Sequence, residues 1–181
     1  MLAFRKSLVW FRRDLRSFAH AALYHALEQS EAVLCVFVFD KEILGGLAPD
    51  DRRVEFIHRS VLELDAELRK LGGALIVSHA MATEDIPRLA AMLEFDAVFA
   101  NHDDEPPAAD RDAKVAYALR AGGRSWLSCK DQAIFEKDEV LSQSGKPFSV
   151  FTPYKNAWLR RLHSDGDDAH LKPYPVDAYR H

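Results

Sequence analysis

Charged side chains gather where three apolar segments of the sequence end. Arg12 and Arg13 follow the first segment, Asp40 follows the second, and Asp103 and Glu105 follow a third. Guanidinium groups donate hydrogen bonds to carbonyl and anionic oxygens, and carboxylates accept them from N–H and O–H groups. If folding brings these groups together, they would hold a small ligand through a few polar atoms. The alternative is that Arg12, Arg13 and Arg16 only form ion pairs with Asp14, Asp40 and the acidic loop after the third segment.

Several familiar catalytic and phosphate-binding motifs are missing. The sequence contains neither GxGxxG nor GxxxxGK[ST]. His102 begins an acidic run, but its spacing matches neither HExxH nor an EF-hand, which favours a solvated acidic loop over a metal site. Ser142, Ser144 and His163 have no nucleophile-elbow context, so a hydrolase triad is not indicated. The pattern favours a planar aromatic chromophore over a nucleotide gripped through its pyrophosphate.

Short apolar segments alternate with amphipathic ones along most of the chain. Apolar residues recur every three or four positions from Val54 to Leu71, which predicts a helix ending at Gly72-Gly73. Strands are expected at 7–10, 32–39, 74–77, 97–99 and 124–127, and further helices at 19–27, about 83–93 and about 110–121. This alternation predicts an α/β fold: a doubly wound, Rossmann-like, five-stranded parallel sheet with strand order 3-2-1-4-5.

The predicted fold determines where the charged residues should lie. In open α/β sheets, ligands bind outside the carboxyl ends of the strands, at the point where the strand order reverses. With the order 3-2-1-4-5, the first and fourth strands flank that point. We therefore expect Arg12, Arg13, Asp103 and Glu105 to converge in one crevice that carries both signs of charge.

Composition excludes several classes of protein. The chain has 181 residues, of which 48% are hydrophobic and 29% charged, with a formal net charge of −4. It therefore lacks the basic excess of a domain that mainly grips nucleic-acid phosphates. Cys35 and Cys129 are the only cysteines, so a disulfide framework or CxxC site is excluded. No apolar run is long enough for a membrane span or a signal peptide, and a cytoplasmic location is expected.

The regular alternation stops after Trp126. A closing helix is expected at 151–162, with Thr152 as its N-cap and Pro153 at its first position. We expect residues 1–162 to form one α/β domain. The polar stretch 163–181 contains several Asp and Pro residues and is expected to be a linker, which suggests a further domain beyond it.

Two motifs in this order resemble the DNA photolyase and cryptochrome family. Leu8-Val-Trp-Phe-Arg-Arg-Asp-Leu-Arg16 is similar to the family's opening segment, and Phe148-Ser-Val-Phe-Thr-Pro-Tyr-Lys-Asn-Ala-Trp158 is similar to the segment that closes its N-terminal α/β domain. Shorter matches lie at 37–40, 52–56, 101–106 and 110–112. The resemblance covers roughly residues 6–162. The family's usual Asp-Asn pair after the first motif is replaced by Ala19 and His20, which predicts a weaker cap for the first helix.

The resemblance implies a light-harvesting domain of a deoxyribodipyrimidine photolyase. In that family, FAD in a separate C-terminal helical domain repairs pyrimidine dimers in damaged DNA, and the N-terminal domain holds an antenna chromophore. This chain alone would then be inactive in repair and would contact DNA little. The positions that match the hydroxy-deazaflavin pocket of the family are Arg13, Phe37, Asp40, Arg53, Asp103 and Glu105. Pro107 and Ala108 stand where folate-type relatives carry the Asn-Glu pair that contacts methenyltetrahydrofolate, so that antenna is disfavoured.

Two alternatives from other functional classes remain open on the sequence. A cryptochrome-type blue-light signalling protein shares the same domain, and only the absence of dimer repair would distinguish it. A free-standing nucleotide-binding domain of the universal-stress type is the second alternative. The missing glycine-rich phosphate loop argues against it.

Overall fold

The computed structural model describes residues 2–48, 50–164 and 171–179. Its centre is a parallel sheet with the order β3-β2-β1-β4-β5. The strands are β1 (Phe4–Phe11), β2 (Ser30–Asp40), β3 (Leu75–Ala80), β4 (Ala97–Asn101) and β5 (Ser125–Cys129). The predicted doubly wound α/β fold and its strand order are confirmed.

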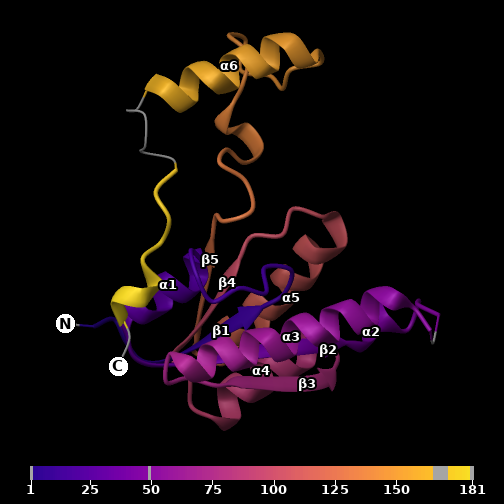
Figure 1. The fold of residues 1–181 in the computed structure, drawn as a ribbon, viewed down its shortest axis with the longest axis vertical. Coiled ribbons are helices and arrows are strands. Elements are labelled where there is room, and N and C mark those ends of the chain that lie inside the picture. Colours follow the sequence, from indigo (N-terminus) through magenta and orange to yellow (C-terminus); the bar gives the residue numbers. More distant parts are fainter. Residues whose placement is uncertain (1, 49, 165–170, 180–181) are drawn as a thin grey trace.

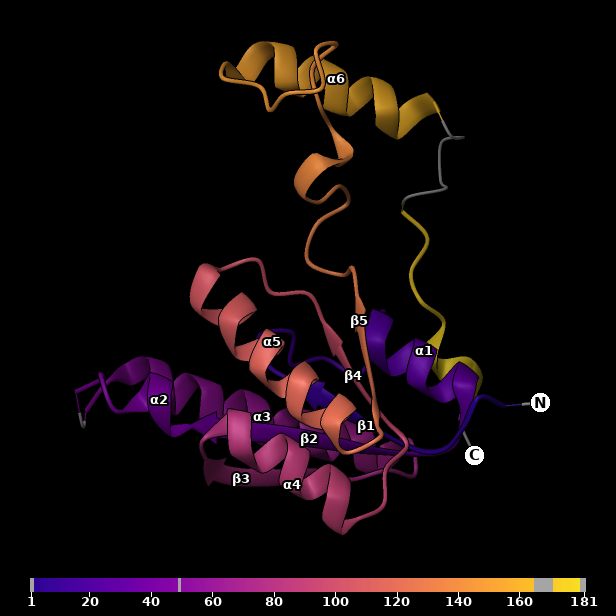
Figure 2. The same cartoon turned by 180° about the vertical axis from the view of Figure 1, so that it is seen from behind.

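Each central strand buries both of its faces. In β1, Val9 and Phe11 enter one hydrophobic cluster, whereas Leu8 and Trp10 enter the other. This alternation follows from the two-residue period of a strand. Helices α1 (Ala21–Gln29) and α3 (Arg52–Lys70) cover the first face, and α4 (Ala82–Met92) and α5 (Pro106–Ala121) cover the second. Figures 1 and 2 show the two helix layers from opposite sides.

The helix ends agree with their local sequence. Helix α3 stops at Lys70, and Gly72 then adopts a positive φ of 87°, which glycine reaches without strain. Helix α5 begins at Pro106, four residues before the expected position, because proline fits the first turn of a helix. A short helix that the sequence did not predict, α2 (Lys41–Leu44), follows β2 directly.

Two elements follow the sheet within residues 130–164. A single 3-10 turn, η1 (Lys137–Glu139), precedes helix α6 (Phe151–Ser164). Helix α6 was predicted, but it begins at Phe151, so Thr152 lies inside its first turn instead of at the N-cap. Figures 1 and 2 show α6 standing away from the sheet. None of its residues is buried.

Residues 171–179 lie in the stretch expected to be a linker, and they pack on α1. The 3-10 turn η2 (Val176–Tyr179) places Val176, only 4% exposed, in the first core cluster. The rings of Tyr174 and Tyr24 have centroids 5.5 Å apart. Residues 165–170 and 180–181 of the expected linker lie outside the described residues. The described part of the chain contains no helix long and apolar enough to cross a membrane.

Candidate ligand-binding site

An ion-paired cluster lies where β1 and β4 end side by side. Arg13 follows β1, and Asp103 and Glu105 follow β4. Arg13 Nη2 donates a hydrogen bond to Glu105 Oε1 at 2.6 Å, and Arg13 Nη1 lies 3.6 Å from Asp103 Oδ1. The hydrogen bond to Glu105 is the main cause that raises the pKa of Arg13. The structure thus brings three of the six predicted residues together at the carboxyl edge of the sheet.

The fourth expected member of this crevice, Arg12, lies beside the cluster. Its Nη1 bonds both carboxylate oxygens of Asp112, at 2.5 and 2.7 Å, and its Nη2 bonds the carbonyl oxygen of Asn101. The Arg12 guanidinium also lies over the ring of Trp10, 5.0 Å from its centroid. Its side chain is only 8% exposed. Arg12 therefore ties β1 to β4 and α5, through a partner, Asp112, that the ion-pair alternative did not name.

Asp103 has a second cation beside it that the sequence did not single out. Arg111, in the first turns of α5, reaches within 3.8 Å of the Asp103 carboxylate. The side chains of Asp103 and Arg111 are only 6% and 12% exposed. The sequence contains Arg111 in the Asp110-Arg-Asp112 segment, but the helix was expected to begin at about residue 110. The earlier start at Pro106 places Arg111 above the end of β4.

Asp40 offers a buried hydrogen-bond acceptor at the end of β2. Its Oδ1 accepts hydrogen bonds from the backbone N–H of Glu42 at 3.1 Å and of Ala82 at 3.4 Å, so it caps α2 and faces the start of α4. Its Oδ2 is buried, and among the described residues it has no hydrogen-bond partner. A buried carboxylate oxygen without a donor costs free energy, so it marks a place that a ligand N–H or O–H would suit.

Phe37 and Arg53 lie apart from these groups. Phe37 is 6% exposed and belongs to the hydrophobic core, with its ring centroid 4.9 Å from that of Phe39. Arg53 is 71% exposed and bonds Asp51 at 2.6 Å, an interaction that lowers the pKa of Asp51 to about 2. No contact joins either residue to Arg13, Asp103 or Glu105 within the described residues.

The neighbours of these two residues line an open groove. Phe39, at the end of β2, and Arg52, at the start of α3, belong to its wall. The groove has a volume of about 720 Å³, within the range of pockets that hold small organic ligands. Its remaining lining consists of Leu44, Asp50, Asp51, Val54, Glu55, His58 and His79. The two predicted residues lie two positions before Phe39 in β2 and one position after Arg52 in α3.

A buried polar network holds the strand ends at the switch point. Asn101 Nδ2 bonds Asp14 Oδ2 and Asp131 Oδ2, the latter at 2.9 Å, while Asn101 Oδ1 accepts from the N–H of Ala22 at 2.8 Å. His20 Nε2 lies 3.0 Å from Asp14 Oδ2. Burial opposes ionisation of Asp14, but the hydrogen bonds from His20 and Asn101 outweigh it and lower the pKa of Asp14.

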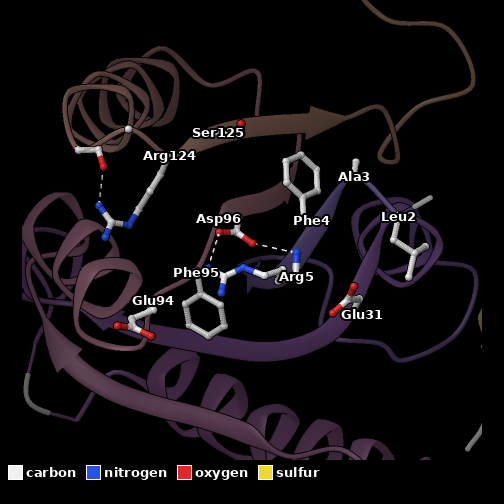
Figure 3. Close-up of a pocket in the computed structure, with 12 residues that line it drawn as sticks. Leu2, Ala3, Phe4, Arg5, Glu31, Glu94, Phe95, Asp96, Arg124 and Ser125 are labelled. Atoms are coloured by element: carbon white, nitrogen blue, oxygen red, sulfur yellow. Dashed lines mark hydrogen bonds and ion pairs between the residues drawn. The ribbon is translucent and has the colours of Figure 1, made fainter.

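A second hollow of about 720 Å³ lies at the opposite, amino-terminal edge of the sheet (Figure 3). Asp96 accepts hydrogen bonds there from the backbone N–H groups of Arg5 and Lys6, at 2.8 and 3.2 Å. Arg124 donates to the carbonyl oxygens of Ala90 and Gly122. Asp96 therefore ties the start of β4 to β1, and Arg124 ties the turn before β5 to α4.

His102 is paired within the fold. Its Nδ1 lies 2.6 Å from Glu136 Oε2, which ties the loop after β4 to the segment before η1. Across the part of the chain that the structure describes, no three His, Cys, Asp or Glu side chains come together in a way that could hold a metal ion. This loop therefore has a structural contact of its own.

Comparisons with known proteins point to one family. A family model described as DNA photolyase matches residues 7–176. A deoxyribodipyrimidine photo-lyase of Synechococcus sp. is 34% identical over 169 residues, which cover 93% of this chain and 33% of that protein. The crystal structure of a bacterial class III photolyase from Agrobacterium tumefaciens matches 97% of this chain and 35% of its own, with a TM-score of 0.78 and 26% identity.

A further structural relative contains two FAD molecules. The archaeal photolyase from Sulfolobus tokodaii, crystallised with two FAD molecules that imply a novel light-harvesting cofactor, is 27% identical to this chain. Its TM-score is 0.66, and the match covers 83% of this chain and 34% of that one. The chain thus spans about a third of the length of these relatives.

Proposed function

Since the chain belongs to the DNA photolyase family, we propose that it is the light-harvesting domain of a deoxyribodipyrimidine photo-lyase. The longer protein would repair pyrimidine dimers in damaged DNA with FAD bound outside this segment. The share of the relatives that the chain matches, about a third, supports this division of roles. The chain's own task would be to hold an antenna chromophore.

The observation that carries this proposal is the chemistry of the carboxyl edge of the sheet. Asp40 has a buried oxygen without a donor among the described residues, and Arg13 and Glu105 form an ion pair whose side chains are 52% and 61% exposed. Exposed ion pairs contribute little to stability, so a ligand can replace this pair at small cost. The groove beside Phe39 adds an apolar wall for a planar ring.

The residues at the start of α5 favour a hydroxy-deazaflavin over a folate. Pro107 has no backbone N–H, and Ala108 is 7% exposed and carries only a methyl group. Neither offers the amide or carboxylate that folate-type relatives place there. Methenyltetrahydrofolate would therefore leave polar atoms without partners at this position.

When bound, such a chromophore absorbs near-ultraviolet or blue light and passes its excitation energy to FAD. The chain's residues bind and orient it. Arg13 would donate hydrogen bonds to carbonyl or anionic oxygens, and Asp40, Asp103 and Glu105 would accept them. Phe39 and Arg52 are better placed than Phe37 and Arg53 to line a ring in the groove. The protein thus contributes position and electrostatics, and the chromophore contributes the optical transition.

The proposal is tested by titrating the protein with a hydroxy-deazaflavin and following its fluorescence. We expect one bound chromophore per chain. Asp40→Asn removes the charge of the buried acceptor but can keep the cap of α2, and it should weaken binding by about tenfold. Glu63→Gln, on the exposed face of α3, is the matched control and should bind like the wild type. Absence of binding by the wild-type protein, or equal affinity in Asp40→Asn, would contradict the proposal.

A further inference from the structure

Asp103 is held between two guanidinium groups of very different exposure. Arg13, which lies 3.6 Å from Asp103 Oδ1, is 52% exposed. Arg111, which lies 3.8 Å from Asp103 Oδ2, is 12% exposed. A ligand that enters the crevice can displace the exposed guanidinium of Arg13, because water already screens the ion pairs that hold Arg13 in place. The buried cation stays in place, so Asp103 keeps one fixed partner.

Arg111 is fixed by a ring instead of by hydrogen bonds. Its guanidinium lies over Trp10, 5.0 Å from the ring centroid, and Trp10 is 2% exposed. Its Nε lies 3.5 Å from Asp112 Oδ1, and neither Nε nor Nη2 makes a hydrogen bond to any residue that the structure describes, although both atoms are buried. A planar cation that stacks on a ring keeps its orientation without such bonds. Arg111 therefore presents its charge to Asp103 from a rigid support.

We infer that Arg111 is a positioning residue for the chromophore site: it fixes the Asp103 carboxylate in one place, so that this group can accept a hydrogen bond from the ligand. The inference rests on the proposed function, because it assigns a residue to the same site. Nη2, the Arg111 atom that faces Asp103, is buried, so we expect Arg111 to act on the ligand through Asp103. In metal sites, removing a group that orients a binding residue typically costs about 10- to 100-fold in affinity, and the same physical argument applies to Asp103.

Arg12 does not serve the same purpose, although it stacks on the same ring. Its guanidinium bonds Asp112 and the carbonyl of Asn101, so its donors are engaged in joining the strand ends to α5. No contact joins Arg12 to Asp103 within the described residues. Of the two arginines on Trp10, only Arg111 is directed to a residue of the proposed site.

The test measures the affinity of the protein for a hydroxy-deazaflavin by fluorescence titration. Arg111→Gln should weaken binding by about tenfold, the range found when a supporting residue of a binding group is removed. Arg111→Lys should weaken binding by less, because it keeps the charge but not the planar stack. Arg120→Gln, in the exposed last turn of α5, is the control and should bind like the wild type. Because lysine keeps the positive charge for the ion pairs, Arg111→Lys provides the test if Arg111→Gln does not fold.

A double-mutant cycle with Asp103→Asn separates positioning from direct contact. If Arg111 acts through Asp103, the double variant should bind as weakly as Asp103→Asn alone, with no further loss. If the affinity losses of Arg111→Gln and Asp103→Asn multiply in the double variant, Arg111 does not act through Asp103 and the positioning role is overturned. Wild-type affinity in both Arg111 variants would also overturn it. A wild-type protein that binds no chromophore would overturn the proposed function itself. If the wild-type protein binds the chromophore but the Arg111 variants do not behave as expected, only the positioning role fails and the proposed function stands.

Discussion

Two acidic residues of the same short loop differ in what they contribute to the fold. The Glu105 side chain is 61% exposed and its pair with Arg13 faces water, whereas the Asp103 side chain is 6% exposed and lies beside the buried Arg111. Water screens the first pair strongly and the second weakly. The loop therefore combines an exposed ion pair at Glu105, which a ligand can replace, with a buried ion pair at Asp103, two residues earlier.

This difference predicts unequal effects on stability. Glu105→Gln should change the free energy of unfolding by about 0–1 kcal/mol. Asp103→Asn should cost about 1–3 kcal/mol, because it leaves the Arg111 cation buried with less compensation. Urea unfolding of the two variants measures both values. Equal losses would mean that the burial of Asp103 has no energetic consequence.

The buried carboxylate of Asp14 makes stability depend on acid pH. Its pKa is lowered in the folded protein by His20 and Asn101, which outweigh the opposing effect of burial. A group with a lowered folded pKa stabilises the fold at pH values above its unfolded pKa, about 3.9, and loses that contribution as the pH falls towards the folded value. Asp14→Asn should therefore be less stable than the wild type at pH 7, and the gap should narrow below about pH 4. Unfolding curves across this range check the sign; a gap that widens on acidification would contradict it.

At the scale of elements, the segment 171–179 acts as a strap on α1. Val176 is 4% exposed in the core cluster that includes Ala22 and Leu23, and Leu171 at the start of the strap is 51% exposed. The strap thus packs against α1, where the rings of Tyr174 and Tyr179 also lie beside Tyr24. Its docking makes it part of the folded body.

Removing the buried side chain should loosen this strap. Val176→Ala deletes two buried carbon atoms, which should cost about 2 kcal/mol of unfolding free energy. Leu171→Ala is the matched control and should cost less, because about half of that side chain is already in water. Thermal or urea unfolding measures the difference. Equal and small losses in the two variants would show that the strap is not held by its core residue.

Local sequence was sufficient for the sheet and for most helices, because their patterns repeat within a few residues. The apolar spacing in α3 and the glycine after it define that helix without any tertiary contact. The cap of α1 was different. The sequence suggested a weak cap at Ala19 and His20, but His20 Nδ1 accepts the N–H of Leu23 at 3.1 Å and so serves as the N-cap. Histidine is an uncommon cap, and its neighbour Asp14 supports it here.

The candidate site was predictable only in part, for a reason of geometry. The convergence of Arg13 with Asp103 and Glu105 follows from strand order, since both segments leave adjacent strands at one edge. The role of Arg111 could not be predicted in this way, because it depends on where α5 begins and on a ring in β1. The buried network of Asp14, Asn101 and Asp131 likewise joins residues that no periodic pattern connects.

At the scale of the whole molecule, the two edges of the sheet have different chemistry. At the amino edge, the charged side chains of Asp96 and Arg124 bond to backbone groups (Figure 3). At the carboxyl edge, Asp40 keeps a buried oxygen without a donor among the described residues, and Arg13 and Glu105 pair in water. This asymmetry is the general expectation for an α/β sheet that binds a ligand at its switch point. It supports an antenna at the carboxyl edge.

The most direct test of this account compares two chromophores on the wild-type protein. Fluorescence titration should give a dissociation constant for a hydroxy-deazaflavin that is about one to two orders of magnitude lower than that for methenyltetrahydrofolate, since Pro107 and Ala108 leave polar atoms of the folate without partners, at about 1–3 kcal/mol. A shifted absorption spectrum should accompany deazaflavin binding. Tighter binding of the folate would contradict the assignment of this site.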